Sequence, residues 1–194
     1  MKLLIGTGNK GKIQEMRDAL AGLPMDILTP EQLDISDMPA ETGSTFAENA
    51  EQKARFYHER SGLPTIADDS GIIVEALQNE LGIHTRRWGK GPDATDYEWV
   101  EFFLERMRNE KNRKARFVCA LAYIDDKGIF HTFEGSCDGV ITHELEADFL
   151  PGLPISACFK PTGYDKVFSA LTIEEKNQIS HRGRALRAFV SFIR

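Results

Sequence analysis

A glycine-rich stretch near the N-terminus has the composition of a phosphate-binding loop. Gly6-Thr7-Gly8-Asn9-Lys10-Gly11-Lys12 follows a short apolar run and precedes a helical pattern. Backbone N–H groups and the positive end of a helix dipole converge at such a loop, and two lysines add charge, so an anionic phosphate is the expected guest. The stretch also approaches the P-loop pattern G-x-x-x-x-G-K, but Ile13 stands where that motif needs a hydroxyl for magnesium. A glycine turn with solvated lysines is the alternative.

A pair of adjacent acids is the second candidate site. Asp68-Asp69-Ser70-Gly71 lies between the apolar segments 65–67 and 72–74. Two buried carboxylates are costly without a partner, and magnesium prefers one or two carboxylates together with phosphate oxygens. We predict these four residues at a strand end or in a tight turn, with a plain surface turn as the alternative. Glu41, in Glu-Thr-Gly, is a weaker candidate of the same kind.

Cations gather near the C-terminus in Ser180-His181-Arg182-Gly183, with Lys176 a little upstream. Ser180 is expected to cap the last helix, which places His181 and Arg182 in its first turn. Cations there oppose the helix dipole unless an anion is shared between them and the N–H groups. The arrangement therefore favours a bound anion, and a solvated first turn is the alternative.

The elements that must position these residues alternate between strands and helices. Hydrophobic periodicity, capping residues and turn residues predict a mixed α/β sheet with flanking helices. Residues 78–92 are expected to form a loop, and a capping box at Thr172 and Glu175 begins the first of two C-terminal helices. The predicted strands are 2–6, 25–28, 115–124, 129–133 and 137–142, and the other predicted helices are 13–20, 45–61 and 93–108.

Length, charge and cysteine content argue against several classes of protein. With 194 residues, we expect a single domain, 1–194. No apolar run approaches the roughly 18 residues of a membrane span, and a formal net charge of −6 argues against a nucleic-acid coat. Three widely spaced cysteines without a CxxC pair favour reduced thiols and a cytoplasmic protein over a disulfide frame or a zinc cage.

The order of these motifs resembles the inosine-triphosphate pyrophosphatase-like family almost from end to end. That family hydrolyses inosine, deoxyinosine and xanthosine triphosphates (ITP, dITP and XTP) to the monophosphate and pyrophosphate. The segments that carry the resemblance are Thr7–Lys12, Glu41–Gly43 with Thr45-Phe46, Glu48–Ala50, Lys53-Ala54, Ile66–Gly71, Asp93–Asp96, Gly139–Thr142, Glu174–Lys176 and Ser180–Gly183.

The resemblance implies an elongated mixed sheet, two lobes around a central nucleotide cleft, a homodimer, and magnesium as cofactor. It assigns Asp69 as proton acceptor and metal ligand, and Glu41 as a second metal-site acid. From charge and hydropathy we expect no nucleic-acid or membrane partner. The residues that would contact the substrate are Thr7, Gly8, Asn9, Lys10, Gly11, Lys12, Ser70, Lys176, His181 and Arg182.

One segment departs from the family. Where its members have Phe-Gly-Tyr/Trp-Asp-Pro ahead of a Phe, this chain has Leu153-Pro154-Ile155-Ser156-Ala157 after Gly152. The aromatic ring and the acid that help to hold the base are absent, so the base preference stays open. Two rival functions follow: a P-loop-like NTPase or kinase, which Ile13 disfavours, and a non-catalytic nucleotide-binding module.

Overall fold

Six strands form one mixed sheet in the order β2-β1-β3-β4-β5-β6. The computed structural model describes residues 2–78, 80–91 and 93–194, so residues 79 and 92 of the loop expected over 78–92 lie outside the described residues. β1 pairs in parallel with β2 and β3, and the other neighbours are antiparallel, as the predicted mixed α/β sheet requires. The strands are β1 (Lys2–Ile5), β2 (Asp26–Leu28), β3 (Thr65–Val74), β4 (Lys114–Ile124), β5 (Phe130–Ile141) and β6 (Phe159–Pro161).

The acid pair lies inside β3, so its prediction at a strand end or in a tight turn is wrong. β3 runs unbroken through it, with Asp68 opposite Leu121 and Asp69 opposite Ala120. The antiparallel partner β4 forms the backbone hydrogen bonds of β3 in this region. The residue types that favour turns give no information about such pairing with a distant strand. Successive side chains in a strand point to opposite faces, so the two carboxylates serve different sides of the sheet.

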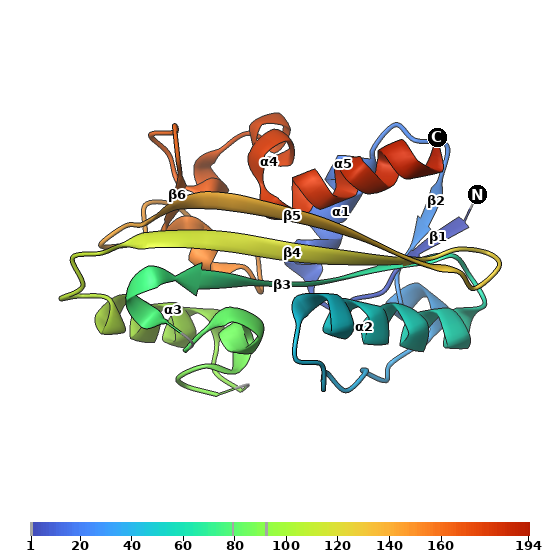
Figure 1. Ribbon diagram of the computed structural model, residues 1–194, viewed down its shortest axis with the longest axis horizontal. Helices are drawn as coiled ribbons and strands as arrows, with labels where there is room; N and C mark the ends of the chain where they lie inside the picture. Colours follow the sequence, from blue (N-terminus) through green and yellow to red (C-terminus); the bar gives the residue numbers. More distant parts are fainter. Residues whose placement is uncertain (1, 79, 92) are drawn as a thin grey trace.

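β5 is likewise one continuous strand. The sequence predicted a gap between segments 129–133 and 137–142, yet β5 pairs with β4 without interruption from Phe130 to Val140. β3, β4 and β5 cross the full width of the molecule in Figure 1, which makes the sheet elongated.

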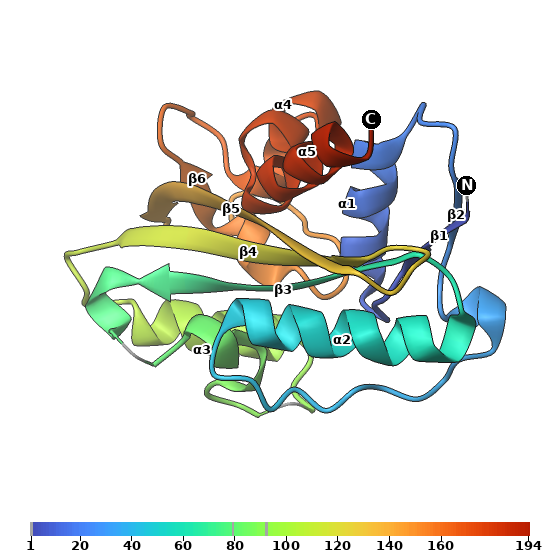
Figure 2. The same cartoon turned by 45° about the vertical axis from the view of Figure 1, so that its right-hand side comes forward.

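Helices cover both faces of the sheet. α1 (Lys10–Leu20), α4 (Ile173–Ile179) and α5 (His181–Ile193) lie on one face. α2 (Phe46–Ser61) and α3 (Asp96–Arg106) lie on the other face (Figures 1 and 2). No helix among the described residues is long and apolar enough to cross a membrane.

Local capping sets where these helices begin. Thr172 and Glu175 form the predicted capping box of α4. α3 begins three residues later than expected, because Thr95 caps it and forms a second capping box with Glu98. Ser180 caps α5 as predicted, by accepting a hydrogen bond from the amide of Gly183.

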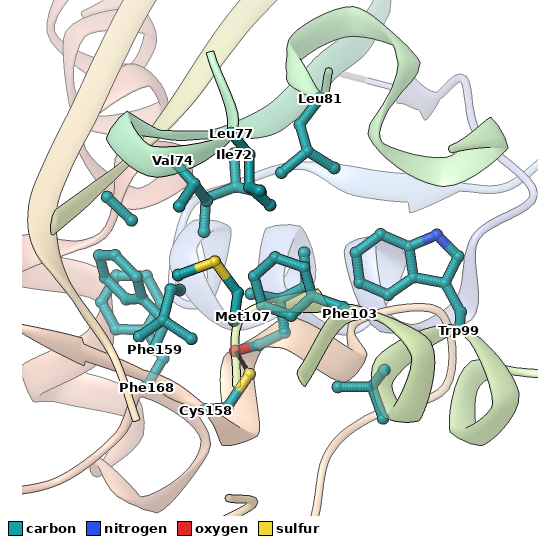
Figure 3. Close-up of a cluster of buried hydrophobic side chains, with 14 of the residues drawn as sticks. Ile72, Val74, Leu77, Leu81, Trp99, Phe103, Met107, Cys158, Phe159 and Phe168 are labelled. Atoms are coloured by element: carbon teal, nitrogen blue, oxygen red, sulfur yellow. Dashed lines mark hydrogen bonds between the residues drawn. The ribbon is translucent and has the colours of Figure 1, made fainter. Parts of the chain in front are cut away.

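The apolar core is divided between the two ends of the long strands. At one end, Trp99 and Phe103 of α3 pack with Phe159 and Phe168 (Figure 3). At the other end, side chains of β1, α1 and α5 form a second cluster, and a third, small-residue cluster lies under α2. The strands therefore join two lobes, each with its own core.

Candidate active site

A cavity of about 570 Å³ lies between the two lobes. Its wall includes the loop after β1, the start of α5, residues of α2 and β3, and the short helix η4 (Pro154–Ala157). β1 pairs with β3 only as far as Ile66, so the cavity opens where β1 ends. Sites outside the carboxyl ends of strands are typical of ligand binding in α/β sheets.

The glycine loop offers unpaired amides at this opening. Asn9 caps α1 by accepting a hydrogen bond from the Lys12 amide at 3.0 Å. Within the described residues, the backbone N–H groups of Gly8 and Lys10 have no hydrogen-bond partner. The loop can thus present the Gly8 amide and the positive end of α1 to a phosphate in the cavity.

Not every residue of the loop lines the cavity. Thr7, Gly8, Asn9 and Lys12 do, whereas Lys10 is exposed and Gly11 faces the other lobe. The Gly11 amide donates to the carbonyl of Pro151 at 3.2 Å, and a Cβ on Gly11 would lie 2.6 Å from that oxygen. Gly11 therefore allows the close approach of the two segments.

Asp68 is fully buried, and two cationic side chains contact its carboxylate. Lys12 Nζ lies 3.1 Å from its Oδ1, and Arg182 donates to its Oδ2 from Nε at 3.1 Å and from Nη2 at 3.0 Å. Burial alone would raise the pKa of Asp68, but the charges of Lys12 and Arg182 outweigh it and hold that pKa far below its usual value. Asp68 is a permanent anion that anchors both cations.

The guanidinium group of Arg182 has three side-chain partners among the described residues: Asp68, Ser70 and Glu15. It also donates to Ser70 Oγ at 2.9 Å and pairs with Glu15 of α1, which in turn pairs with Lys176. Burial acts to lower the pKa of Arg182, yet Asp68 and Glu15 raise it. Arg182 lines the cavity as part of a rigid ion network rather than as a cation with unused donors.

His181 is neutral, which differs from the cation assumed in the sequence analysis. Its ring is buried and stacks on Phe117 at 4.6 Å between centroids. Burial, followed by the charge of Arg182, lowers the pKa of His181 well below its usual value. Among the described residues, Nδ1 is buried without a hydrogen-bond partner, and the residue lines the cavity.

Asp69 faces α2 on the opposite side of β3. Lys53 Nζ lies 2.9 Å from Asp69 Oδ1 and 2.9 Å from Glu41 Oε1, while Asn49 donates to Asp69 Oδ2 at 3.2 Å. Burial favours the neutral amine of Lys53, but Asp69, Asp68 and Glu41 prevail and raise its pKa. The predicted metal-site acids are thus brought together around one ammonium group.

The donor set suits a divalent cation held jointly with a ligand. Asp69 and Glu41 supply carboxylate oxygens, the ligands that magnesium prefers, and both already face one cationic group. Within the described residues, no three His, Cys, Asp or Glu side chains are arranged to hold a metal by themselves. Phosphate oxygens and water would complete the coordination.

The other end of the cavity is apolar and aromatic. Trp99 of α3, Phe117 of β4 and Phe168 line it, together with Leu153 and Ile155. The segment 153–156, which lacks the family's aromatic and acid, forms part of this wall. Its one polar side chain, Ser156, donates its hydroxyl to the carbonyl of Leu153 at 2.6 Å.

The sequence analysis assigned no site role to three residues that contact the acids or cations of the site: Lys53, Asn49 and Glu15. Lys53 and Asn49 are buried on the same stripe of α2 as Ala50 and Ala54. A lysine on the apolar face of an amphipathic helix is a detectable signal, because lysine is rarely buried without a partner. Glu15 carries no such signal, since only the fold brings it to Arg182.

Comparison with known proteins shows which family this chain resembles along its whole length. The model of the Ham1 family matches residues 3–192. The chain is 39% identical over 193 residues to a dITP/XTP pyrophosphatase of Leptospira interrogans, covering 100% of this chain and 97% of that protein. It is 41% identical over 204 residues to a protein of the same name from Aquifex aeolicus, with the same coverage. The Ham1 protein of Staphylococcus aureus superposes with a TM-score of 0.81 at 29% identity, covering 100% of this chain and 98% of that one.

Proposed function

This chain belongs to the Ham1 family, and we propose that it hydrolyses non-standard purine nucleoside triphosphates. ITP, dITP and XTP would be cleaved between the α- and β-phosphates to the monophosphate and pyrophosphate. Such a reaction clears aberrant purines from the nucleotide pool.

One observation carries the proposal: a single cavity joins an ion-lined end to an aromatic end. The first end has lysines, backbone amides and carboxylates, which suit a metal–polyphosphate group. The second end has flat apolar side chains, which suit a purine ring. The volume of about 570 Å³ falls in the range of ordinary ligand pockets, which is roughly 300 to 1,000 Å³.

Asp69 is the general base in this proposal. Its carboxylate would accept the proton of the attacking water, and Asn49 holds the carboxylate in place through Oδ2. Magnesium bound by Asp69 and Glu41 would supply positive charge that neutralises the phosphoryl oxygens. Lys12 and the amides of the glycine loop would bind the departing pyrophosphate, which is catalysis by positioning and electrostatics.

Four carboxylates and four cations face each other around the ion-lined end, within the described residues. They are Glu15, Glu41, Asp68 and Asp69 with Lys12, Lys53, Lys176 and Arg182. The charges cancel before any ligand binds. A triphosphate therefore needs additional positive charge, which supports the proposal that magnesium enters with the substrate.

We also propose that the chain acts as a single domain, as a homodimer and in the cytoplasm, without nucleic-acid or membrane partners. The sheet shared by both lobes supports the single domain. Light scattering of the purified protein tests the homodimer, because its 21.8 kDa chain would give twice that mass.

The decisive experiment is a panel of nucleoside triphosphates with magnesium and quantification of the product. We expect pyrophosphate from ITP, dITP and XTP, with much slower release from ATP. Orthophosphate as the product would favour the P-loop NTPase or kinase, and binding without any product would favour the non-catalytic module. Either result contradicts the proposed reaction.

A further inference from the structure

Lys53 occupies the point where the two proposed metal-site carboxylates converge. Its ammonium nitrogen lies 2.9 Å from Asp69 and 2.9 Å from Glu41. The side chains of Lys53 and Asp69 are each only 9% exposed, so water screens this contact weakly. The position that a shared cation would take between the two acids is therefore filled by the protein itself.

Electrostatics explains why the position is filled. Two carboxylates that share a partly buried site repel each other unless a positive charge lies between them. Asn49 satisfies only the second oxygen of Asp69 and carries no charge. Among the described residues that contact Asp69 through a side chain, Lys53 alone supplies a positive charge.

We propose that Lys53 is an internal substitute for the divalent metal. In the metal-free protein its ammonium group holds Glu41 and Asp69 together, and metal binding requires it to withdraw. This inference rests on the proposed function for the identity of the two metal-site acids. It adds that the protein without nucleotide binds the metal weakly, because the ion must displace a cation that is already bound.

The displaced group would remain within the cavity. Lys53 lines the same cavity as Lys12 and the glycine loop, and a lysine side chain has a flexible four-carbon stem. A bound triphosphate would give the ammonium a new anionic partner. Metal and nucleotide should therefore each increase the affinity of the protein for the other, as thermodynamic linkage requires.

The test measures Mn²⁺ binding in the absence of nucleotide, by electron paramagnetic resonance of the unbound ion. Lys53→Met should bind Mn²⁺ at least tenfold more tightly than the wild type. Lys53→Arg keeps the positive charge and should bind as weakly as the wild type. Unchanged or weaker binding by Lys53→Met overturns the inference.

Lys12→Met is the matched control, because it removes a lysine of the same ion network that faces Asp68 instead. It should change the Mn²⁺ affinity far less than Lys53→Met does. An equal gain in both variants would mean a general effect of charge and would contradict a substitute role for Lys53. Adding Glu41→Gln to Lys53→Met should cancel the gain, and a persisting gain would place the ion elsewhere and overturn the inference.

A measurement on the unaltered protein covers the case in which Lys53→Met does not fold. The ¹⁵N-labelled ammonium of Lys53 can be followed by NMR and assigned by its absence from Lys53→Arg. Saturating Mg²⁺ should shift this signal or remove it, whereas an unchanged signal at saturation refutes displacement. None of these readouts needs turnover, so they are independent of the pyrophosphate assay that tests the proposed function.

Discussion

Asp68 and Asp69 are neighbours in β3, yet their carboxylates face opposite sides of the sheet. Asp68 binds Lys12 and Arg182 beneath α1 and α5, whereas Asp69 binds Lys53 of α2. Strand geometry alone produces this division, because side chains alternate along a strand. Two adjacent identical residues thus have separate surroundings: Asp68 is held by Lys12 and Arg182, and Asp69 by Lys53 and Asn49.

Asp69→Asn should fold normally and lose turnover by roughly 10²- to 10⁴-fold, the usual contribution of a general base. The amide keeps the shape of the side chain but cannot accept the proton of the attacking water. Pyrophosphate release from ITP measures the effect, and a thermal melt checks the fold. Asp165→Asn, at an exposed position, is the control and should leave turnover unchanged. Near-normal turnover of Asp69→Asn would remove Asp69 from this role.

Asp68→Asn should destabilise the protein by about 3 to 5 kcal/mol, because removal of one partner leaves buried charges uncompensated. Asp68 is 0% exposed, so solvent cannot replace it. Urea unfolding measures the free energy of unfolding. A variant as stable as the wild type would show that Asp68 is not needed to compensate the buried charges of Arg182 and Lys12.

Lys12→Ala should chiefly weaken triphosphate binding, with KM for ITP raised roughly tenfold or more, since a charge-assisted contact with phosphate contributes about 1.5 to 3 kcal/mol. Steady-state kinetics on ITP measures it. Lys166→Ala removes an exposed lysine outside the cavity and should behave as the wild type does. If KM and kcat of Lys12→Ala are both unchanged, Lys12 does not contact the substrate.

The buried neutral state of His181 predicts a pH dependence of stability. The pKa of His181 is lowered in the folded chain, so below pH of about 6.5 the unfolded chain binds a proton that the folded chain does not. Stability should therefore fall as the pH falls through this region, by up to about 1.4 kcal/mol per pH unit from this group. His181→Gln should flatten the slope below about pH 6.5, measured by urea unfolding. An unaltered slope would mean that His181 becomes protonated in the folded protein.

The sequence predicted those parts of the fold that depend on local signals. The caps at Ser180 and Thr172 were correct, because a cap needs only a few consecutive residues. The continuity of β3 through Asp68 and Asp69 was missed, because it depends on pairing with β4, some 50 residues away along the chain.

The candidate site likewise contains residues that the sequence pattern predicts and residues that only the fold brings to them. The glycine loop and the acid pair have recognisable residue types, and most of their expected side chains line the cavity. The partners of those side chains come from elsewhere in the fold: Lys53 from α2, and Glu15 from α1. The neutral state of His181 could not be predicted from the sequence either, because it follows from burial of the ring against Phe117 in the folded chain.

A single amide side chain joins the glycine loop to the segment that follows Gly152. Asn9 Oδ1 caps α1, while its Nδ2 donates at 3.3 Å to the carbonyl of Gly152, the residue before the atypical 153–157 segment. Gly152 has a φ of +80°, and a Cβ there would lie 2.4 Å from Asn9 Nδ2, so no larger residue fits the junction. Variation in the 153–157 segment is consequently expected only beyond this junction, where it leaves the contact between Asn9 and Gly152 unchanged.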